Sequence, residues 1–296
     1  MTNSNGFGVT VIGDRINPGF KTTKALFDSN DLAGIQALAV RQVEAGASYL
    51  DVNVGSRAMT DQALLVEVTR AIQAAVTVPL CFDFPSAAVQ EVYLKTYDRS
   101  RAGGALPMVN SITEHRFDLM DLYKPLGPFK VIVMASERVE DGAAKANKTT
   151  EEIYSTARRM ALRLHKDYGM PMGDIFIDIS VSAVIADTTG LHRATLDAIR
   201  AIRGDSDLSG VRIMGGLTNI GQQLPAKAAD GSDLKLSLEC AFLTLAVPLG
   251  FDAVLATPWR ALKPLPDDNY VLNAYKNFLE QTGTNALRAV RKLYKM

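Results

Sequence analysis

The sequence predicts an α/β fold, a (β/α)8 barrel of the TIM type, from two observations. Short runs of apolar, often β-branched residues recur along the 296 residues, and a segment with helical periodicity follows each run. This alternation is typical of βαβ units around a parallel sheet. Carboxylates and amides also stand at the ends of most runs. The predicted strands are residues 9–12, 49–54, 79–83, 106–111, 129–134, 174–178, 211–217 and 251–255.

Two of the helices predicted between these strands have clear start and stop signals. Residues 31–45 carry one apolar stripe, and residues 150–168 follow Thr149 and begin with acidic residues, which the N-terminus of a helix favours. Gly46 and Gly169 come directly after these segments, and glycine commonly ends a helix. Both segments are therefore expected to be complete helices that lead into the next strand.

No fixed-period repeat, low-complexity tract or flexible linker divides the chain, so residues 1–296 are expected to form one domain. After the eighth strand a proline-rich break introduces a helical tail, residues 263–296, expected to close the barrel or to join a dimer. Residues 136–148 combine charges, alanines and one glycine, and we interpret them as a mobile surface loop after the fifth strand.

The composition excludes several kinds of partner. Lysine plus arginine and aspartate plus glutamate each total 32, so no global charge attracts nucleic acid or an anionic membrane. Apolar stretches such as residues 241–247 are far shorter than the ~20 residues that span a bilayer, and the polar N-terminus is no signal peptide. We therefore expect a cytoplasmic protein. The two cysteines and three histidines lack metal-ligand spacing, so no protein-held metal is expected.

The predicted active site lies at the C-terminal ends of the strands, because that face of a barrel gathers residues from all its units. Any one aspartate or asparagine there could simply cap a helix or form a turn. Asp51 and Asn53, however, are two residues apart, point the same way and need a partner or ligand if buried. The polar residues at these ends are Asp14, Asn17, Asp51, Asn53, Asp83, Asn110, Asp178 and Asn219.

Acidic and amide side chains without a basic cluster suit a neutral heterocycle that offers several N–H donors. Pterin is such a molecule, since its aminopyrimidinone edge presents an amino group and a ring N–H that one carboxylate can accept together. The residues alone predict a barrel enzyme with a polar rim and leave the ligand open.

These strand-end motifs resemble those of pterin-binding methyltransferases related to dihydropteroate synthase, especially the methyltetrahydrofolate:corrinoid methyltransferases. The resemblance covers almost the whole barrel and implies a dihydropteroate synthase-like fold. The segment at residues 216–222 is its most diagnostic part. The motifs are IGDRIN at 12–17, LDVNVG at 50–55, LCFD at 80–83, NS at 110–111, ID at 177–178 and GLTNIGQ at 216–222.

The resemblance implies a role for each polar residue. Asp83, Asn110 and Asp178 would hold the pterin edge, and Asn219 would be the catalytic residue beside N5 of the pterin, with the two aspartates as its catalytic partners. Gly216, Thr218 and Gln222 would shape the loop of Asn219, and Asp51, Asn53, Asp14 and Asn17 would surround the pterin. The chain departs from its relatives at Asp14, where glutamate occurs, and at Lys227, a candidate for binding the folate tail where some have arginine.

The implied reaction moves a methyl group between N5 of tetrahydrofolate and the cobalt of cobalamin. The barrel and its tail occupy the 296 residues, so the cobalamin is expected on a separate corrinoid protein, and a homodimer is the family expectation. Three alternatives remain open: a methanopterin-dependent corrinoid methyltransferase, dihydropteroate synthase, and a non-catalytic folate-binding module. The synthase would need a basic diphosphate pocket, and a mere binder has no need for an amide beside N5.

Overall fold

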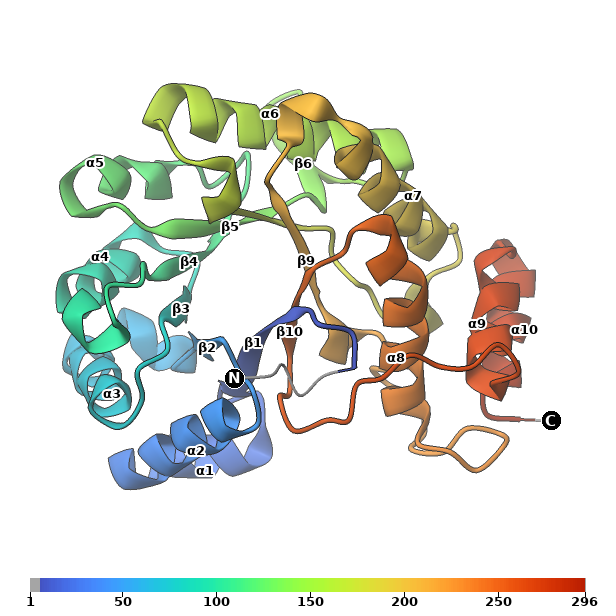
Figure 1. The fold of residues 1–296 in the computed structure, drawn as a ribbon, viewed down its shortest axis with the longest axis horizontal. Coiled ribbons are helices and arrows are strands. Elements are labelled where there is room, and N and C mark those ends of the chain that lie inside the picture. Colours follow the sequence, from blue (N-terminus) through green and yellow to red (C-terminus); the bar gives the residue numbers. More distant parts are fainter. Residues whose placement is uncertain (1–5, 296) are drawn as a thin grey trace.

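In the computed structural model, which describes residues 6–295, parallel strands close into a barrel with the helices outside (Figure 1). The strand order around the barrel is β1-β10-β9-β8-β5-β4-β3-β2. The predicted fold class and all eight predicted strands are confirmed, although the first extends beyond residue 12. The barrel strands are β1 Thr10–Ile16, β2 Tyr49–Val52, β3 Leu80–Asp83, β4 Met108–Ile112, β5 Lys130–Met134, β8 Ile175–Asp178, β9 Arg212–Gly216 and β10 Ala253–Ala256.

The outer helices form where the sequence provides caps. Thr149 and Glu152 make a reciprocal capping box at the start of α6, and Gly169 ends that helix in the left-handed conformation, with φ 64°. Both predicted helices, now α2 and α6, are confirmed. The helices around the barrel are α1 Lys21–Asp28, α2 Leu32–Glu44, α3 Gln62–Ala75, α4 Ala87–Thr96, α5 Tyr123–Leu126, α6 Thr150–Tyr168, α7 Leu191–Gly204 and α8 Leu234–Ala246.

Alternation along the strands decides which side chains reach the site. One buried cluster, which includes Ile12, Cys81, Met108, Phe176 and Met214, fills the barrel interior. Residues two positions further along a strand point the same way. The interior side of the next layer, at the C-terminal strand ends, is therefore formed by Asp14, Asp83, Asn110, Asp178 and Gly216. The apolar layer is thus a floor beneath a polar mouth.

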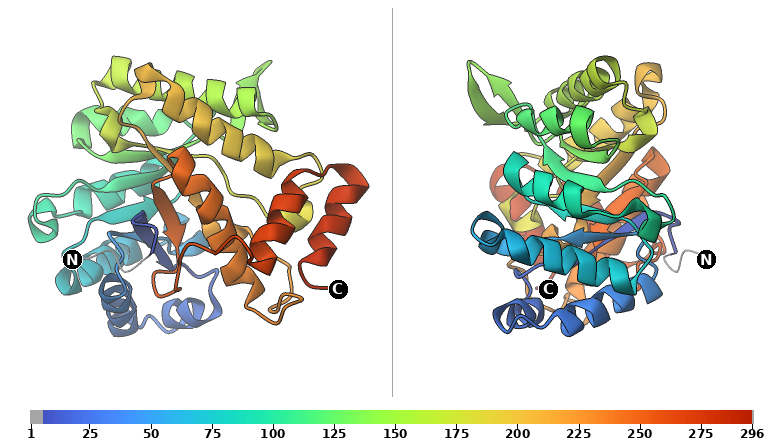
Figure 2. Two further views of the ribbon diagram at one scale, coloured as in Figure 1. Left: turned by 45° about the vertical axis from the view of Figure 1, so that its right-hand side comes forward. Right: turned by 90° about the vertical axis from the view of Figure 1, so that its left-hand side faces the viewer.

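The segment after β5 corrects an expectation. Residues 136–148, predicted to be a mobile loop, contain an antiparallel hairpin of β6 Glu137–Glu140 and β7 Ala143–Ala146. Its turn is Asp141-Gly142, with φ 55° and 76°, a conformation that the Asp-Gly pair favours. The hairpin, in green, extends away from the barrel (Figure 2, right).

The tail is helical, as predicted, but it does not close the barrel, because β1 pairs directly with β10. Helices α9 Tyr270–Leu279 and α10 Gly283–Lys292 pack together, and α9 packs against α8 at the edge of the molecule (Figure 1). Tyr275 of α9 lies 2.8 Å from Nδ1 of the buried His192, whose Nε2 lies 3.0 Å from the Ser182 carbonyl. This chain of contacts ties the tail to the loop after β8. The single-domain organisation and the homodimer stay predictions.

Candidate functional site

Two amide–carboxylate pairs line the mouth on the β2–β4 side. Asn53 Nδ2 donates to Asp83 Oδ2 over 2.9 Å, and Asn110 Nδ2 donates to Asp51 Oδ1 over 3.2 Å. The strand register makes these pairs possible, since Asp51 is level with Cys81, and Asp83 with Asn110. Because the NH2 group of Asn110 donates to Asp51, its carbonyl oxygen is left as an acceptor that a ligand could use.

Asp178 brings a third carboxylate to the mouth from β8. Its Oδ1 accepts the backbone N–H of Ser180 over 2.6 Å, which fixes the carboxylate and leaves Oδ2 for a ligand. Residue 180 has a positive φ of 56°, so the chain turns sharply here. Sequence reasoning did not single out Ser180, because its contact with Asp178 is made by the backbone and depends on this turn.

The carboxylates at the mouth are held in an environment that disfavours their charge. Burial raises the pKa of Asp178 to about 6. The pKa of Asp51 is raised well above its usual value by burial and by the neighbouring charge of Asp83, and burial also raises the pKa of Asp83. A neutral ligand that offers N–H donors would stabilise these charges, because hydrogen bonds would replace the lost hydration.

Asn219 lies on the opposite side, in the 3-10 turn Leu217–Asn219 that follows β9. Its Oδ1 accepts a hydrogen bond from Gln222 Nε2 over 2.7 Å, so its own NH2 group remains the available donor. A Cβ atom added at Gly216, whose Cα hydrogens face the mouth, would lie 3.1 Å from Asn219 Nδ2. The amide is therefore folded back over the mouth, and a side chain at residue 216 would crowd it.

The first strand contributes Asp14, which is only 5% exposed. Its Oδ1 accepts the hydroxyl of Thr257 over 3.0 Å, a contact across the seam where the barrel closes. Burial raises the pKa of Asp14, and Thr257, Arg15 and Thr218 partly offset this effect. The sequence analysis did not predict Thr257. It lies four residues after Ala253, whose side chain points into the barrel, so strand alternation could have indicated it.

Two of the predicted site residues, Asn17 and Lys227, make no hydrogen bond with the other predicted site residues within the described part of the chain. Asn17 is partly buried and uses Oδ1 to accept the backbone N–H of Gly19 over 2.8 Å, a turn-stabilising role. Lys227 is exposed, and its backbone bridges to Asp233 in the loop between β9 and α8. Its role in binding the folate tail stays a prediction.

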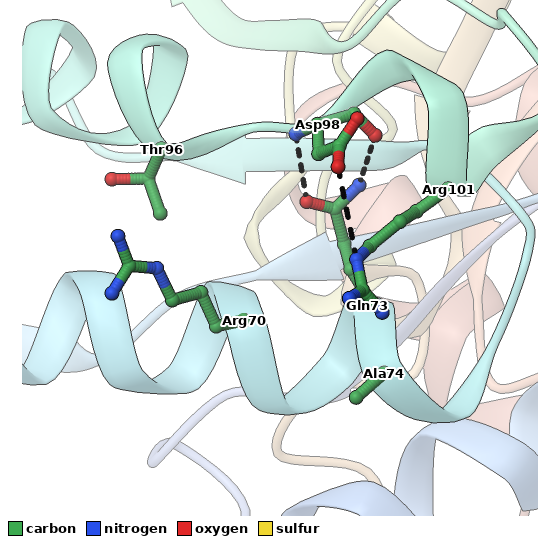
Figure 3. A pocket seen from close by; sticks show the side chains of 6 residues that line it. All are labelled: Arg70, Gln73, Ala74, Thr96, Asp98 and Arg101. Atoms are coloured by element: carbon green, nitrogen blue, oxygen red, sulfur yellow. Dashed lines mark hydrogen bonds and ion pairs between the residues drawn. The ribbon is translucent and has the colours of Figure 1, made fainter.

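A separate hollow of about 490 Å³ lies at the other end of the barrel (Figure 3). It is lined by the C-terminal ends of α3 and α4, and helix C-termini lie beside the N-terminal ends of the strands, the stability face of such barrels. The amide of Gln73 is fully used there, since it donates to the Asp98 carbonyl and accepts the Asp98 N–H. The hollow is thus remote from the polar mouth.

Within residues 6–295, no group of three or more histidine, cysteine, aspartate or glutamate side chains could hold a metal ion. In the same part of the chain, no helix is long and apolar enough to cross a membrane. Cys81 and Cys240 are both buried and unpaired with one another.

The closed barrel with polar residues at its mouth places the protein in the class of (β/α)8-barrel proteins. Comparison with known sequences identifies its family. The model of the pterin binding enzyme family matches residues 16–256, so the chain belongs to that family. The predicted resemblance is thereby confirmed.

One relative is similar in sequence, and solved structures are similar in fold. The methylcorrinoid:tetrahydrofolate methyltransferase of Eubacterium limosum is 25% identical over 251 residues, 84% of each chain. Dihydropteroate synthase of Stenotrophomonas maltophilia has a similar fold, with a TM-score of 0.58 and 20% identity over 86% of this chain and 89% of that one. The Xanthomonas albilineans synthase in complex with 7,8-dihydropteroate gives a TM-score of 0.54 and 17% identity over 88% and 91%.

Proposed function

We propose that this protein transfers a methyl group between N5 of tetrahydrofolate and the cobalt of a corrinoid carried by a separate protein. The observation that carries the proposal is the opposite use of two amides at the mouth. Asn110 offers a carbonyl acceptor because Asp51 takes its NH2 group, whereas Asn219 offers an NH2 donor because Gln222 takes its oxygen.

These two amides match the two ends of a pterin. The aminopyrimidinone edge carries N–H donors and needs acceptors, which Asp83, Asp178 and the oxygen of Asn110 provide. N5 lies in the other ring and carries a lone pair whether or not it is methylated, so a hydrogen-bond donor suits it. Asn219, in the turn after β9 and across the mouth from Asp83 and Asn110, provides one. Thr218 and Gly216 would position the loop, and Asp51 and Asn53 would support the edge contacts.

The amide would act mainly in the transition state. As the bond between N5 and the methyl carbon breaks, its electron pair moves onto N5, so an N–H aimed at that atom binds more strongly than in the ground state. An amide does not release its proton near neutral pH, and the proton that N5 finally takes up must come from another group. Asn219 is therefore expected to stabilise charge and not to donate a proton.

The choice of substrates is supported by the relative in Eubacterium limosum, whose name combines a methylcorrinoid and tetrahydrofolate. The corrinoid is a second substrate, presented by its own carrier protein at the mouth. Methanopterin shares the pterin edge and would satisfy the same acceptors, so the folate tail must discriminate between the two. Lys227, exposed on the loop beyond Gln222, is the candidate for that contact.

The direct test mixes the protein with 5-methyltetrahydrofolate and reduced cobalamin, either free or on a corrinoid carrier protein, and follows the absorption of methylcobalamin. Formation of methylcobalamin at a rate proportional to protein concentration supports the proposal. Parallel reactions with methyl-tetrahydromethanopterin, and with pterin diphosphate plus p-aminobenzoate, test the two enzymatic alternatives. Dihydropteroate formation without methyl transfer would overturn the proposal in favour of the synthase, and tight folate binding without either reaction would favour a binding module.

A further inference from the structure

Two glutamine side chains reach from the outer helices to the strands that form the mouth. Gln42 on α2 and Gln90 on α4 are both completely buried, at 0% exposure. A buried amide needs hydrogen-bond partners, because nothing else replaces its lost hydration. Both side chains find partners in the backbone next to an acidic residue of the mouth, Asp14 for Gln42 and Asp83 for Gln90.

Gln90 holds the backbone on both sides of Asp83. Its Nε2 donates to the carbonyl oxygen of Phe82 over 2.8 Å and to that of Phe84 over 3.0 Å. The two hydrogens of one amide group thus bind the residue before the acid and the residue after it. The Asp83 carboxylate itself accepts a hydrogen bond from Asn53. The direction of this carboxylate is therefore fixed through the backbone by Gln90 and through the side chain by Asn53.

Gln42 holds the backbone next to Asp14, where the pairing of strands is irregular. The register of β1 against β2 shifts between Gly13 and Ile16. Gln42 Oε1 accepts the backbone N–H of Arg15 over 3.0 Å within this stretch. A Cβ atom at residue 13 would lie 2.6 Å from the same oxygen, so glycine leaves the space that the amide occupies. A side chain from α2 thus fixes the strand directly after Asp14.

Each of these glutamines uses only one end of its amide. Within residues 6–295, Gln42 Nε2 and Gln90 Oε1 are buried and have no hydrogen-bond partner. An unpaired buried polar atom destabilises a fold, and an apolar side chain of the same size would avoid it. Burial of the side chain therefore does not explain the amide at either position. What the amide supplies is a fixed backbone beside a carboxylate of the mouth.

Gln73 on α3 is a contrasting case in the same protein. It is also buried, and it binds loop backbone with both ends of its amide, since it donates to the Asp98 carbonyl and accepts the Asp98 N–H. This contact lies in the hollow at the other end of the barrel (Figure 3). Gln73 thus stabilises a loop that carries none of the predicted site residues.

We propose that Gln42 and Gln90 are positioning residues for pterin binding, each of which fixes the backbone beside a mouth carboxylate so that the carboxylate is aligned with the N–H donors of the ligand. The inference rests on the proposed function and adds two residues, outside the mouth itself, on which folate affinity depends. Hydrogen bonds weaken steeply when donor and acceptor are misaligned, so a site needs surrounding contacts that hold its side chains in place.

The test replaces each glutamine by methionine, which keeps the size and the unbranched shape but has no amide. In Gln90→Met, the dissociation constant of 5-methyltetrahydrofolate is expected to rise about tenfold, the equivalent of one hydrogen bond lost at the pterin edge. The rate of methyl transfer at saturating folate should change less, because Asp83 is expected at the end of the pterin away from N5. Gln42→Met should weaken binding in the same direction. Calorimetry measures the affinity and stopped-flow absorption the rate.

Gln73→Met is the matched control. It should lose at least as much thermal stability as Gln90→Met, because both ends of the Gln73 amide are hydrogen-bonded. Its folate affinity should equal that of the intact protein. A fall in affinity as large as that of Gln90→Met would overturn the inference, since affinity would then follow overall stability.

Unchanged folate affinity in both Gln42→Met and Gln90→Met would also overturn the inference, even if both variants were less stable. If Gln90→Met does not fold, Gln42→Met and Gly13→Ala decide by the same comparison, because the added Cβ atom crowds the Gln42 amide. An intact protein that binds folate but transfers no methyl group would contradict the proposed function and leave the comparison of affinities decisive. An intact protein that binds no folate would overturn both.

Discussion

At the scale of single residues, the hydrogen bonds that Asn110 and Asn219 already make within the protein determine which amide atom each can offer to a ligand. Gln222 fixes Asn219 as a donor and Asp51 fixes Asn110 as an acceptor. The residue type alone does not show whether an asparagine acts as a donor or an acceptor, since its side chain contains both groups. Sequence analysis can suggest the partner of Asn219, because Gln222 is only three residues away. It cannot suggest the Asn110–Asp51 contact, which joins residues 59 positions apart and depends on strand register.

Replacement of Asn219 tests the donor. Asn219→Ala is expected to slow methyl transfer by about 10²-fold, the usual effect of losing one donor to a developing charge, while the dissociation constant of folate changes little. Stopped-flow absorption of methylcobalamin measures the first quantity and calorimetry the second. An equal loss in both would mean that Asn219 binds the ground state. Asp83→Ala is the matched comparison, expected to weaken binding more than it slows the bound substrate.

Gly216 tests the position of that amide. Gly216→Ala places a Cβ atom 3.1 Å from Asn219 Nδ2, close enough to push the amide or its loop away. We expect a loss of rate smaller than that of Asn219→Ala, with folding retained because the backbone at 216 has an ordinary negative φ of −81°. The same kinetic assay with circular dichroism checks this. An unchanged rate would show that the amide does not need its present position.

At the scale of elements, alternation along strands could be predicted, and long-range pairing could not. The inward positions two residues apart on β1, β3, β4 and β8 follow from the strand period alone. The burial of Glu239 was not predicted, because its helix, α8, is otherwise mostly apolar and does not show which of its faces is buried. Thr257 was missed because the seam that joins it to Asp14 spans 243 positions.

The hairpin after β5 was missed for another reason. The charges and alanines of residues 136–148 suggested a loop, but the Asp141-Gly142 pair is a strong hairpin signal that outweighs them. Gly142→Val should therefore destabilise the hairpin by about 1 kcal/mol, because residue 142 has a φ of 76° that a β-branched side chain resists. Faster amide exchange confined to β6 and β7 would be the expected signature. Unchanged exchange would contradict the assigned turn.

At the scale of the whole molecule, the polar mouth should cost stability that ligand binding recovers. The pKa of Asp178 rises from 3.8 to about 6 in the folded state, so its contribution to stability is fully present below pH 3.8 and is lost as pH rises through about 6. Asp178→Asn should then stabilise the ligand-free protein at pH 7 by up to about 3 kcal/mol while weakening folate binding. Urea unfolding at pH 4 and pH 7 measures the effect, and an equal stability change at both pH values would argue against this cause.

The strand count, the helix layer and the position of the mouth could all be predicted, because each depends on local periodicity. The tail was predicted to be helical, but its position beside α8 depends on contacts such as Tyr275–His192 between distant segments. The family match over residues 16–256 covers the barrel from the last residue of β1 to the end of β10 and ends before this tail. The tail is therefore the part of the chain where family comparison adds least.

The central claim is that the mouth grips a pterin by its donor edge and holds the Asn219 amide at N5. A crystal structure of the protein with 5-methyltetrahydrofolate tests it most directly. We expect the aminopyrimidinone edge against Asp83, Asn110 and Asp178, with Asn219 Nδ2 about 3 Å from N5. A pterin bound outside the mouth, or one whose N5 lies beyond hydrogen-bond reach of residue 219, would contradict the account.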